Sequence, residues 1–235
     1  MDKNLHAGHR ERVRKEFLEN GYDDAVPAHK LLEHLLFYAI PRCDTNEIAH
    51  RLIDKFGDLS GVIDAPVSEI VKVEGVGENA ATLIKLILPV ARRYNVEKTS
   101  GKINFPSLSL ADDYIQKQYL GFTTERLGIL GLNSVGDKTV FKFLSEGDIS
   151  TVGVSVRDIV KAAIDSNSTA VILCHNHPSN NCLPSSADIE ITKNVFTALK
   201  QIGIRLADHV IVGVNDYVSL YQSQKYHYLF EDSLY

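Results

Sequence analysis

The chain has 235 residues, enough for two small domains, and 44% of them are hydrophobic, as in an ordinary globular protein. Its 25 Lys and Arg residues and 30 Asp and Glu residues give a net charge of −5, which argues against a strongly basic nucleic-acid binder. No apolar segment resembles a secretory signal or a membrane span, and the three cysteines form no Cys-x-x-Cys pair. We therefore expect a cytoplasmic protein that has no membrane association.

The first part of the chain is predicted to be helical. Three helices are each followed by a Gly or Pro that ends them, and Asp44 is the expected N-cap of the third. They cover residues 8–20, 28–40 and 45–56.

Residues 70–84, IVKVEGVGENAATLI, resemble a helix-hairpin-helix, with two short helices joined by Gly75-Val76-Gly77. Gly75 and Gly77 would let the backbone approach a phosphate, to which the next helix points its N–H groups. Two glutamates, Glu74 and Glu78, flank this hairpin and repel phosphate. The alternatives are therefore non-specific DNA binding or a compact helical module that packs against the other domain or a partner.

A change in composition marks the domain boundary. Residues 96–106, VEKTSGKINFP, are polar, contain Gly and Pro, and show no periodicity. We expect a helical, helix-hairpin-helix-like domain over residues 1–95, a linker over 96–106 and a second domain over 107–235.

The second domain is predicted to alternate helices and strands, which favours a mixed α/β layer fold. Helices are expected at residues 108–119, 156–165 and 185–202, and strands at 125–133, 138–145, 151–154, 170–174, 204–212 and 217–220. The Tyr-rich tail, residues 221–235, packs on this domain or mediates self-association.

The stretch AVILCHNHPSNNCLPSSAD, residues 170–188, carries the candidate metal site. His175 and His177 follow a buried strand and are two residues apart, so both imidazoles share one side. Asp188 lies on the packed side of the next helix, where a buried carboxylate needs a partner. Two imidazoles and a carboxylate suit Zn²⁺ with one open position, although a lone His-x-His is more often structural. Ser185 is also an ordinary N-cap residue.

This spacing, His175-x-His177 followed by Ser185-x-x-Asp188, resembles the JAMM motif of the JAB/MPN metalloproteases. The segment His175-Asn176-His177-Pro178-Ser179 and the later pair Asp208-His209 resemble the RadC branch of that family. The resemblance implies a mixed-sheet α/β domain with a cytidine-deaminase-like layer architecture. Two other zinc or nuclease motifs fit poorly, because HNH nucleases spread their residues further and zinc deaminases need H-x-E with P-C-x-x-C.

The resemblance also implies roles for the site residues. Several carboxylates are candidates for the general base that is not a metal ligand, namely Glu125, Glu146, Asp158 and Glu190. The family pattern selects Glu125, which precedes the first core strand, and Glu146 is the alternative. It assigns oxyanion stabilisation to Ser185. Asp208 and His209 are candidates for orienting a ligand imidazole, and Cys182 would close the site if it were a fourth ligand.

Two functions follow as hypotheses. The first is a zinc-dependent metallohydrolase, a peptidase or isopeptidase with one Zn²⁺ per chain and an unidentified protein or peptide substrate. The alternative is a DNA-associated or scaffold protein that acts through the helical domain and has a structural or vestigial metal site. The ligand types also suit other transition metals, and the oligomeric state stays open.

Overall fold

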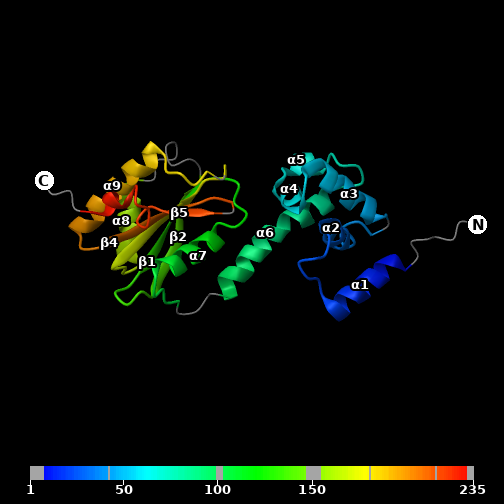
Figure 1. The fold of residues 1–235 in the computed structure, drawn as a ribbon, viewed down its shortest axis with the longest axis horizontal. Helices are drawn as coiled ribbons and strands as arrows, with labels where there is room; N and C mark the ends of the chain where they lie inside the picture. The colour runs from blue at the N-terminus through cyan, green and yellow to red at the C-terminus, as the bar shows by residue number, and fades with distance from the viewer. Residues whose placement is uncertain are drawn as a thin grey trace, which may run out of the picture. The chain divides into compact units, whose positions relative to one another are not determined.

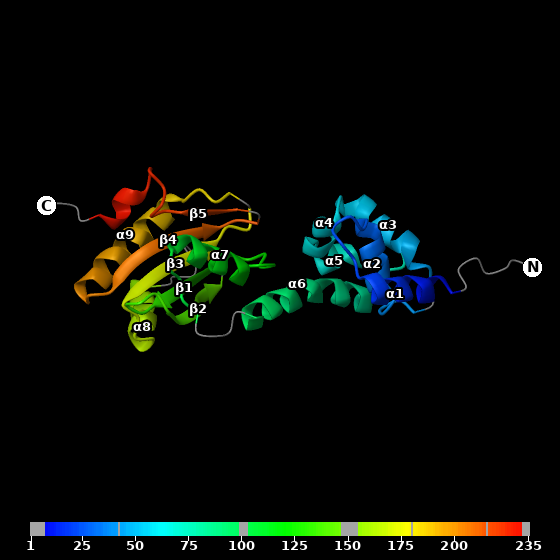
Figure 2. The ribbon, with the colours of Figure 1, turned by 60° about the horizontal axis from the view of Figure 1, so that its bottom comes forward.

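The computed structural model describes residues 8–41, 43–98, 103–146, 155–179, 181–214 and 216–231. The chain forms two compact units, Met1–Ala91 and Arg92–Tyr235 (Figures 1 and 2). Within the described ranges, no helix is sufficiently long and apolar to cross a membrane.

The first unit is helical, as predicted. Its helices are α1 (His9–Asn20), α2 (Ala28–Leu36), α3 (Thr45–Phe56), α4 (Leu59–Asp64), α5 (Val67–Ile70) and the first part of α6 (Glu78–Lys98). Asp44 caps α3 as expected, because its side chain accepts a hydrogen bond from the Asn46 N–H. Large apolar side chains from five of these helices are fully buried together and form one core: Leu32, Leu36, Leu52, Val62, Ile70 and Ile84.

Helix α2 is shorter than predicted, because it ends at Leu36 and not at Ile40. Pro41 has no N–H with which to continue the helical ladder. The guanidinium of Arg10 instead donates to the carbonyl oxygens of Phe37 at 3.2 Å, Ile40 at 2.6 Å and Cys43 at 2.5 Å. A side chain from α1 thus binds carbonyl oxygens of the segment that follows α2.

The connection between α5 and α6 turns at Gly75, which has a φ of 87°. A side chain at this position would also clash, since its Cβ would lie 2.8 Å from Cδ1 of Ile48 on α3. Both constraints explain why glycine occupies the turn.

The segment predicted as a linker, residues 96–106, has regular structure at both described ends. Helix α6 continues to Lys98, beyond Val96. After the undescribed residues 99–102, Asn104 forms an isolated antiparallel bridge with Asp137, and Phe105 is buried. Burial of the Phe105 side chain explains why this segment joins the second unit rather than remaining separate from it.

The second unit contains a five-stranded mixed sheet, which confirms the predicted α/β class. Its strands run in the order β2-β1-β3-β4-β5, and only β3 and β4 are parallel. They are β1 (Arg126–Leu132), β2 (Lys138–Glu146), β3 (Ala170–Asn176), β4 (Arg205–Val212) and β5 (Tyr217–Ser219).

Helices cover both faces of this sheet (Figure 2). Helix α7 (Leu108–Gln118) packs on the face that carries Leu130 and Ile172. Helices α8 (Val156–Asp165) and α9 (Ser186–Gln201) pack on the opposite face, which carries Ile129 and Leu173. The strand predicted at residues 151–154 lies outside the described residues.

The described part of the Tyr-rich tail packs on its own unit. It contains the short 3-10 helix η1 (His227–Phe230). Tyr226 and Leu229 are buried in a cluster with Ile211 of β4 and Leu220. Of the two expectations for this tail, the contacts of residues 221–231 correspond to packing on the domain.

Candidate metal centre

The end of β3 brings the two histidines of the motif together. Every residue of β3 from Ala170 to Asn176 is buried, as predicted for a strand covered on both faces. The ladder to β4 extends one step further, because the His177 N–H donates to the Val212 carbonyl at 2.8 Å. As a result the Nε2 atoms of His175 and His177 lie 2.8 Å apart.

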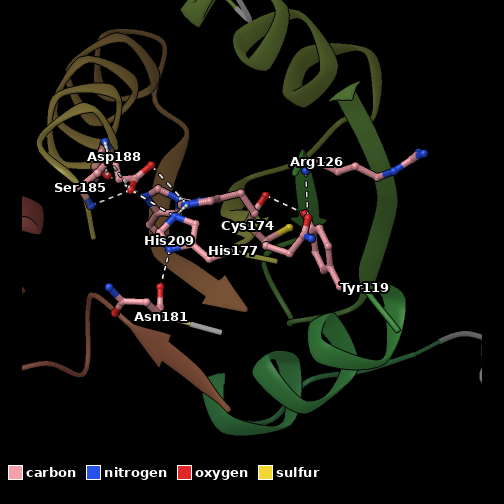
Figure 3. Close-up of polar contacts among 11 residues, drawn as sticks. Tyr119, Arg126, Cys174, His177, Asn181, Ser185, Asp188 and His209 are labelled. Atoms are coloured by element: carbon pink, nitrogen blue, oxygen red, sulfur yellow. Dashed lines mark hydrogen bonds and ion pairs between the residues drawn. The ribbon is translucent and has the colours of Figure 1, made fainter. Parts of the chain in front are cut away.

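The first turn of α9 adds the carboxylate of Asp188 (Figure 3). One oxygen, Oδ1, lies 3.2 Å from Nε2 of His175, and Oδ2 lies 3.5 Å from Nε2 of His177. Asp188 is 2% exposed, as its helical spacing predicted. Burial alone would raise the pKa of Asp188, but the adjacent His175 and His177 imidazoles hold that pKa well below its usual range.

Ser185 is the N-cap of α9 and forms a capping box with Asp188. Its backbone N–H and its hydroxyl each donate to Oδ2 of Asp188 at 2.7 Å. In this structure the Ser185 hydroxyl therefore orients the Asp188 carboxylate.

Hydrogen bonds from behind the site assign the tautomers of the two imidazoles. The Thr192 hydroxyl donates to the Asp188 carbonyl oxygen at 2.5 Å, so it accepts from Nδ1–H of His209 at 2.7 Å. Nε2 of His209 is then an acceptor and takes the Nδ1–H of His175 at 2.9 Å. Burial keeps the pKa of His209 well below its usual value, in agreement with a neutral ring.

The second imidazole is assigned in the same way. Nδ1–H of His177 donates to the backbone carbonyl oxygen of Asn181 at 2.6 Å. Both histidines thus direct Nε2 lone pairs at one another beside the Asp188 carboxylate. Such an arrangement needs a cation, either a proton or a metal ion, and Zn²⁺ is suited to these nitrogen and oxygen donors.

Glu125 lies immediately before β1 and faces the same point. The candidate ligand atoms of Glu125, His175 and His177 all lie within 4.8 Å of one another. Of the alternative bases, Glu146 forms an ion pair with Arg126 at 2.7 Å, Asp158 forms the capping box of α8 with Ser155, and Glu190 is exposed on α9.

Of the other candidates, only His209 contacts a histidine of the motif. Asp208 accepts hydrogen bonds from the N–H groups of His209 and Tyr221 at 2.6 Å and 2.9 Å, and from the Ser219 hydroxyl. Its carboxylate therefore anchors the segment after β5. Cys182 contacts the Asp216 carbonyl oxygen through Sγ at 3.5 Å. It does not belong to the cluster that Glu125, His175 and His177 form among the described residues.

An open cleft of about 410 Å³ gives access to this centre. The residues that line it come from the segment before β1 and from the loop between β3 and α9. They are Glu125, His177, Pro178, Ser179, Asn181, Leu183, Pro184 and Ser185.

Sequence reasoning did not identify Thr192 or Asn181 as members of the site. The helical spacing of Asp188 and Thr192 indicates that they share a face, but it does not reveal the contact of Thr192 with His209. The Asn181 backbone oxygen that accepts from His177 could not be identified from the sequence, because every residue carries such an oxygen.

The two candidate phosphate-contacting glycines, Gly75 and Gly77, belong to the first unit. They sit at the turn before α6, where Arg51 donates to the Glu74 carbonyl oxygen at 2.9 Å and forms an ion pair with the Glu74 carboxylate at 3.7 Å. Glu78 is the first residue of α6. The turn thus offers helix N–H groups but is flanked by acidic side chains.

Comparison with known proteins gives two findings. The model of a family described as "RadC-like JAB domain" matches residues 106–226. The UPF0758 protein FN0909 of Fusobacterium nucleatum subsp. nucleatum is 35% identical over 226 residues, which cover 93% of this chain and 97% of that protein.

Proposed function

The chain belongs to the family of proteins with a RadC-like JAB domain, and from this premise we propose that it is a zinc-dependent metallohydrolase that cleaves an amide bond of a peptide or isopeptide. The observation that carries the proposal is the convergence of the His175 and His177 Nε2 atoms with the Asp188 carboxylate. These three residues would hold the ion and leave one position open to the cleft.

The residues around the ion divide the chemical work. When bound, Zn²⁺ lowers the pKa of a water molecule and polarises the scissile carbonyl. Glu125, which is in reach of the same point, accepts a proton and returns it to the leaving amine. Ser185 would stabilise the oxyanion of the substrate by exchanging its hydrogen bond to Asp188 for one to the substrate.

We place this activity in the cytoplasm, with no membrane association. The three cysteines, Cys43, Cys174 and Cys182, are all free thiols. Free thiols are typical of a reducing compartment.

Metal content tests the site directly. Mass spectrometry of the full chain, purified without chelator, should find about one zinc ion per chain, and Asp188→Ala should lose it. Asp158→Ala is the matched control, because Asp158 forms the same kind of capping box in α8, with its side chain bonded to Ser155, whereas Asp188 also contacts both motif histidines. A wild-type chain that binds no zinc even when zinc is added would overturn the proposal.

The role of Glu125 is tested with Glu125→Gln on a fluorogenic library that contains peptide and lysine isopeptide bonds. The variant should still contain about one zinc ion per chain, with an affinity lowered by no more than about 10-fold, and should lose about 10²- to 10⁴-fold in rate, as expected when a general base is removed. Glu146→Gln should cleave at the wild-type rate, since Glu146 is paired with Arg126. Cleavage by Glu125→Gln at the wild-type rate would exclude Glu125 as the base.

A DNA-associated role for the first unit is the second candidate. The positive φ of Gly75 and the N-terminus of α6 favour phosphate contact, whereas Glu74 and Glu78 oppose it. Binding of the full chain to duplex and branched DNA should then weaken steeply with salt. Absence of binding at low salt removes this candidate.

A further inference from the structure

Asn176, the residue between the two motif histidines, points in the opposite direction from them. It is the last residue of β3 and is 4% exposed. Because neighbours in a strand alternate, its side chain does not share the side of His175 and His177. The proposed zinc chemistry assigns it no role.

Its amide group instead holds the backbone on either side of Glu125. Oδ1 of Asn176 accepts from the Arg126 N–H at 2.9 Å, and Nδ2 donates to the Thr124 carbonyl oxygen at 3.1 Å. Thr124 and Glu125 lie outside β1, which begins at Arg126. The last Cα pair between β1 and β3 is Leu127 with His175, so the Asn176 side chain adds a rung beyond that ladder.

From this geometry we propose that Asn176 is a positioning residue, which couples Glu125 to the strand that carries His175 and His177. This inference rests on the proposed function, in which Glu125 acts at the metal. The peptide unit before Glu125 and the one after it are both tied to a residue that lies between the two histidines. The Asn176 side chain thereby helps to hold the candidate ligand atom of Glu125 within 4.8 Å of those of His175 and His177.

The amide of Asn176 meets both demands. The two backbone partners differ in kind, one being a donor and the other an acceptor, and a carboxamide supplies the complementary pair. Removal of the side chain would take the partner from a partly buried N–H and a partly buried carbonyl, and the segment before β1 would be less firmly held.

A double-mutant cycle on zinc affinity tests the proposal without a known substrate. Zinc dissociation constants are measured by competition with a chromophoric chelator for the full-length wild type, Asn176→Ala, Glu125→Gln and the double variant. Loss of a group that supports a metal site typically weakens metal binding about 10- to 100-fold, and we expect about 10-fold for each single variant. The double variant should bind zinc as Glu125→Gln does, because Asn176 acts through Glu125.

Asn133→Ala is the matched control. Its Oδ1 accepts from the Val135 and Asp137 N–H groups and so pins the backbone at the other end of β1. This variant should lower the unfolding temperature and leave zinc affinity unchanged. Asn176→Ser, which keeps a small polar group at the buried position, replaces Asn176→Ala if the latter does not fold.

Unchanged zinc affinity in Asn176→Ala, or effects of the two substitutions that multiply in the double variant, would overturn the coupling. This failure is distinct from failure of the proposed function. If the wild type binds zinc and the variants show the expected zinc affinities, but no peptide is cleaved, the positioning role of Asn176 stands and the hydrolase function is contradicted.

Discussion

At the scale of single residues, the hydroxyl of Thr192 determines which nitrogen of each buried imidazole carries its proton. It donates to the Asp188 carbonyl oxygen, and this direction is passed through His209 to His175. The lone pair of His175 at Nε2 is therefore set by a hydroxyl that touches neither motif histidine.

Thr192→Val, which preserves shape and removes the hydroxyl, should weaken zinc binding about 10- to 100-fold, because His175 loses its preferred tautomer. Chelator competition measures this change. Thr197→Val is the control, since Thr197 donates to the Lys193 carbonyl oxygen in the same helix but is exposed. Equal zinc affinities for the two variants would contradict the tautomer assignment.

At the scale of elements, a side chain from α1 holds the segment that follows α2. Arg10 donates to three carbonyl oxygens of that segment. Arg10→Gln should lower the free energy of unfolding by about 1–2 kcal/mol, since bonds to a charged donor are lost at a partly buried site. Urea denaturation measures the loss. Lys15→Gln, on the same helix, should change stability by less than about 0.5 kcal/mol, because the interaction of Lys15 with the described residues is an exposed pair with Glu19. Equal losses would show that Arg10 does not stabilise this segment.

The sequence predicted most element boundaries of the second unit, because their caps are local. Ser155 and Ser185 form capping boxes with residues only three positions away. Long-range pairing was not accessible in this way. The pairing of β3 with β4 shifts register between Val171 and Ile172, so spacing alone could not tell whether Asp208 or His209 faces the site. The contact of Asn176 with the segment around Glu125 likewise depends on the pairing of β1 with β3.

At the scale of the whole molecule, a buried carboxyl group that becomes charged at high pH limits stability. Asp112 of α7 is fully buried, Gln222 donates to its Oδ2 at 2.8 Å, and Oδ1 has no hydrogen-bond partner among the described residues. Burial, followed by the charge of Asp208, raises the pKa of Asp112 from 3.8 to about 7. The folded state therefore holds a proton that the unfolded chain releases above about pH 4.

Because the folded state holds this proton more tightly than the unfolded chain does, the stability of the fold falls as the pH rises. The contribution of Asp112 to stability is greatest below pH 4 and is lost as the pH rises towards 7, with an upper bound of about 4 kcal/mol. Asp112→Asn should thus raise the unfolding temperature more at pH 8 than at pH 5, as measured by calorimetry. Asp113→Asn is the exposed neighbouring control. An equal change at both pH values for Asp112→Asn would exclude this titration.

The closeness of His175 and Asp188 along the chain has a consequence for the order of folding. The loop between them is short, so bringing its ends together has a small entropic cost. Glu125 and His209 reach the same place only after β1 and β4 have paired with β3, which are contacts of longer range. During synthesis the three proposed ligands therefore leave the ribosome before β4 does, and they could capture an ion while the sheet is still incomplete.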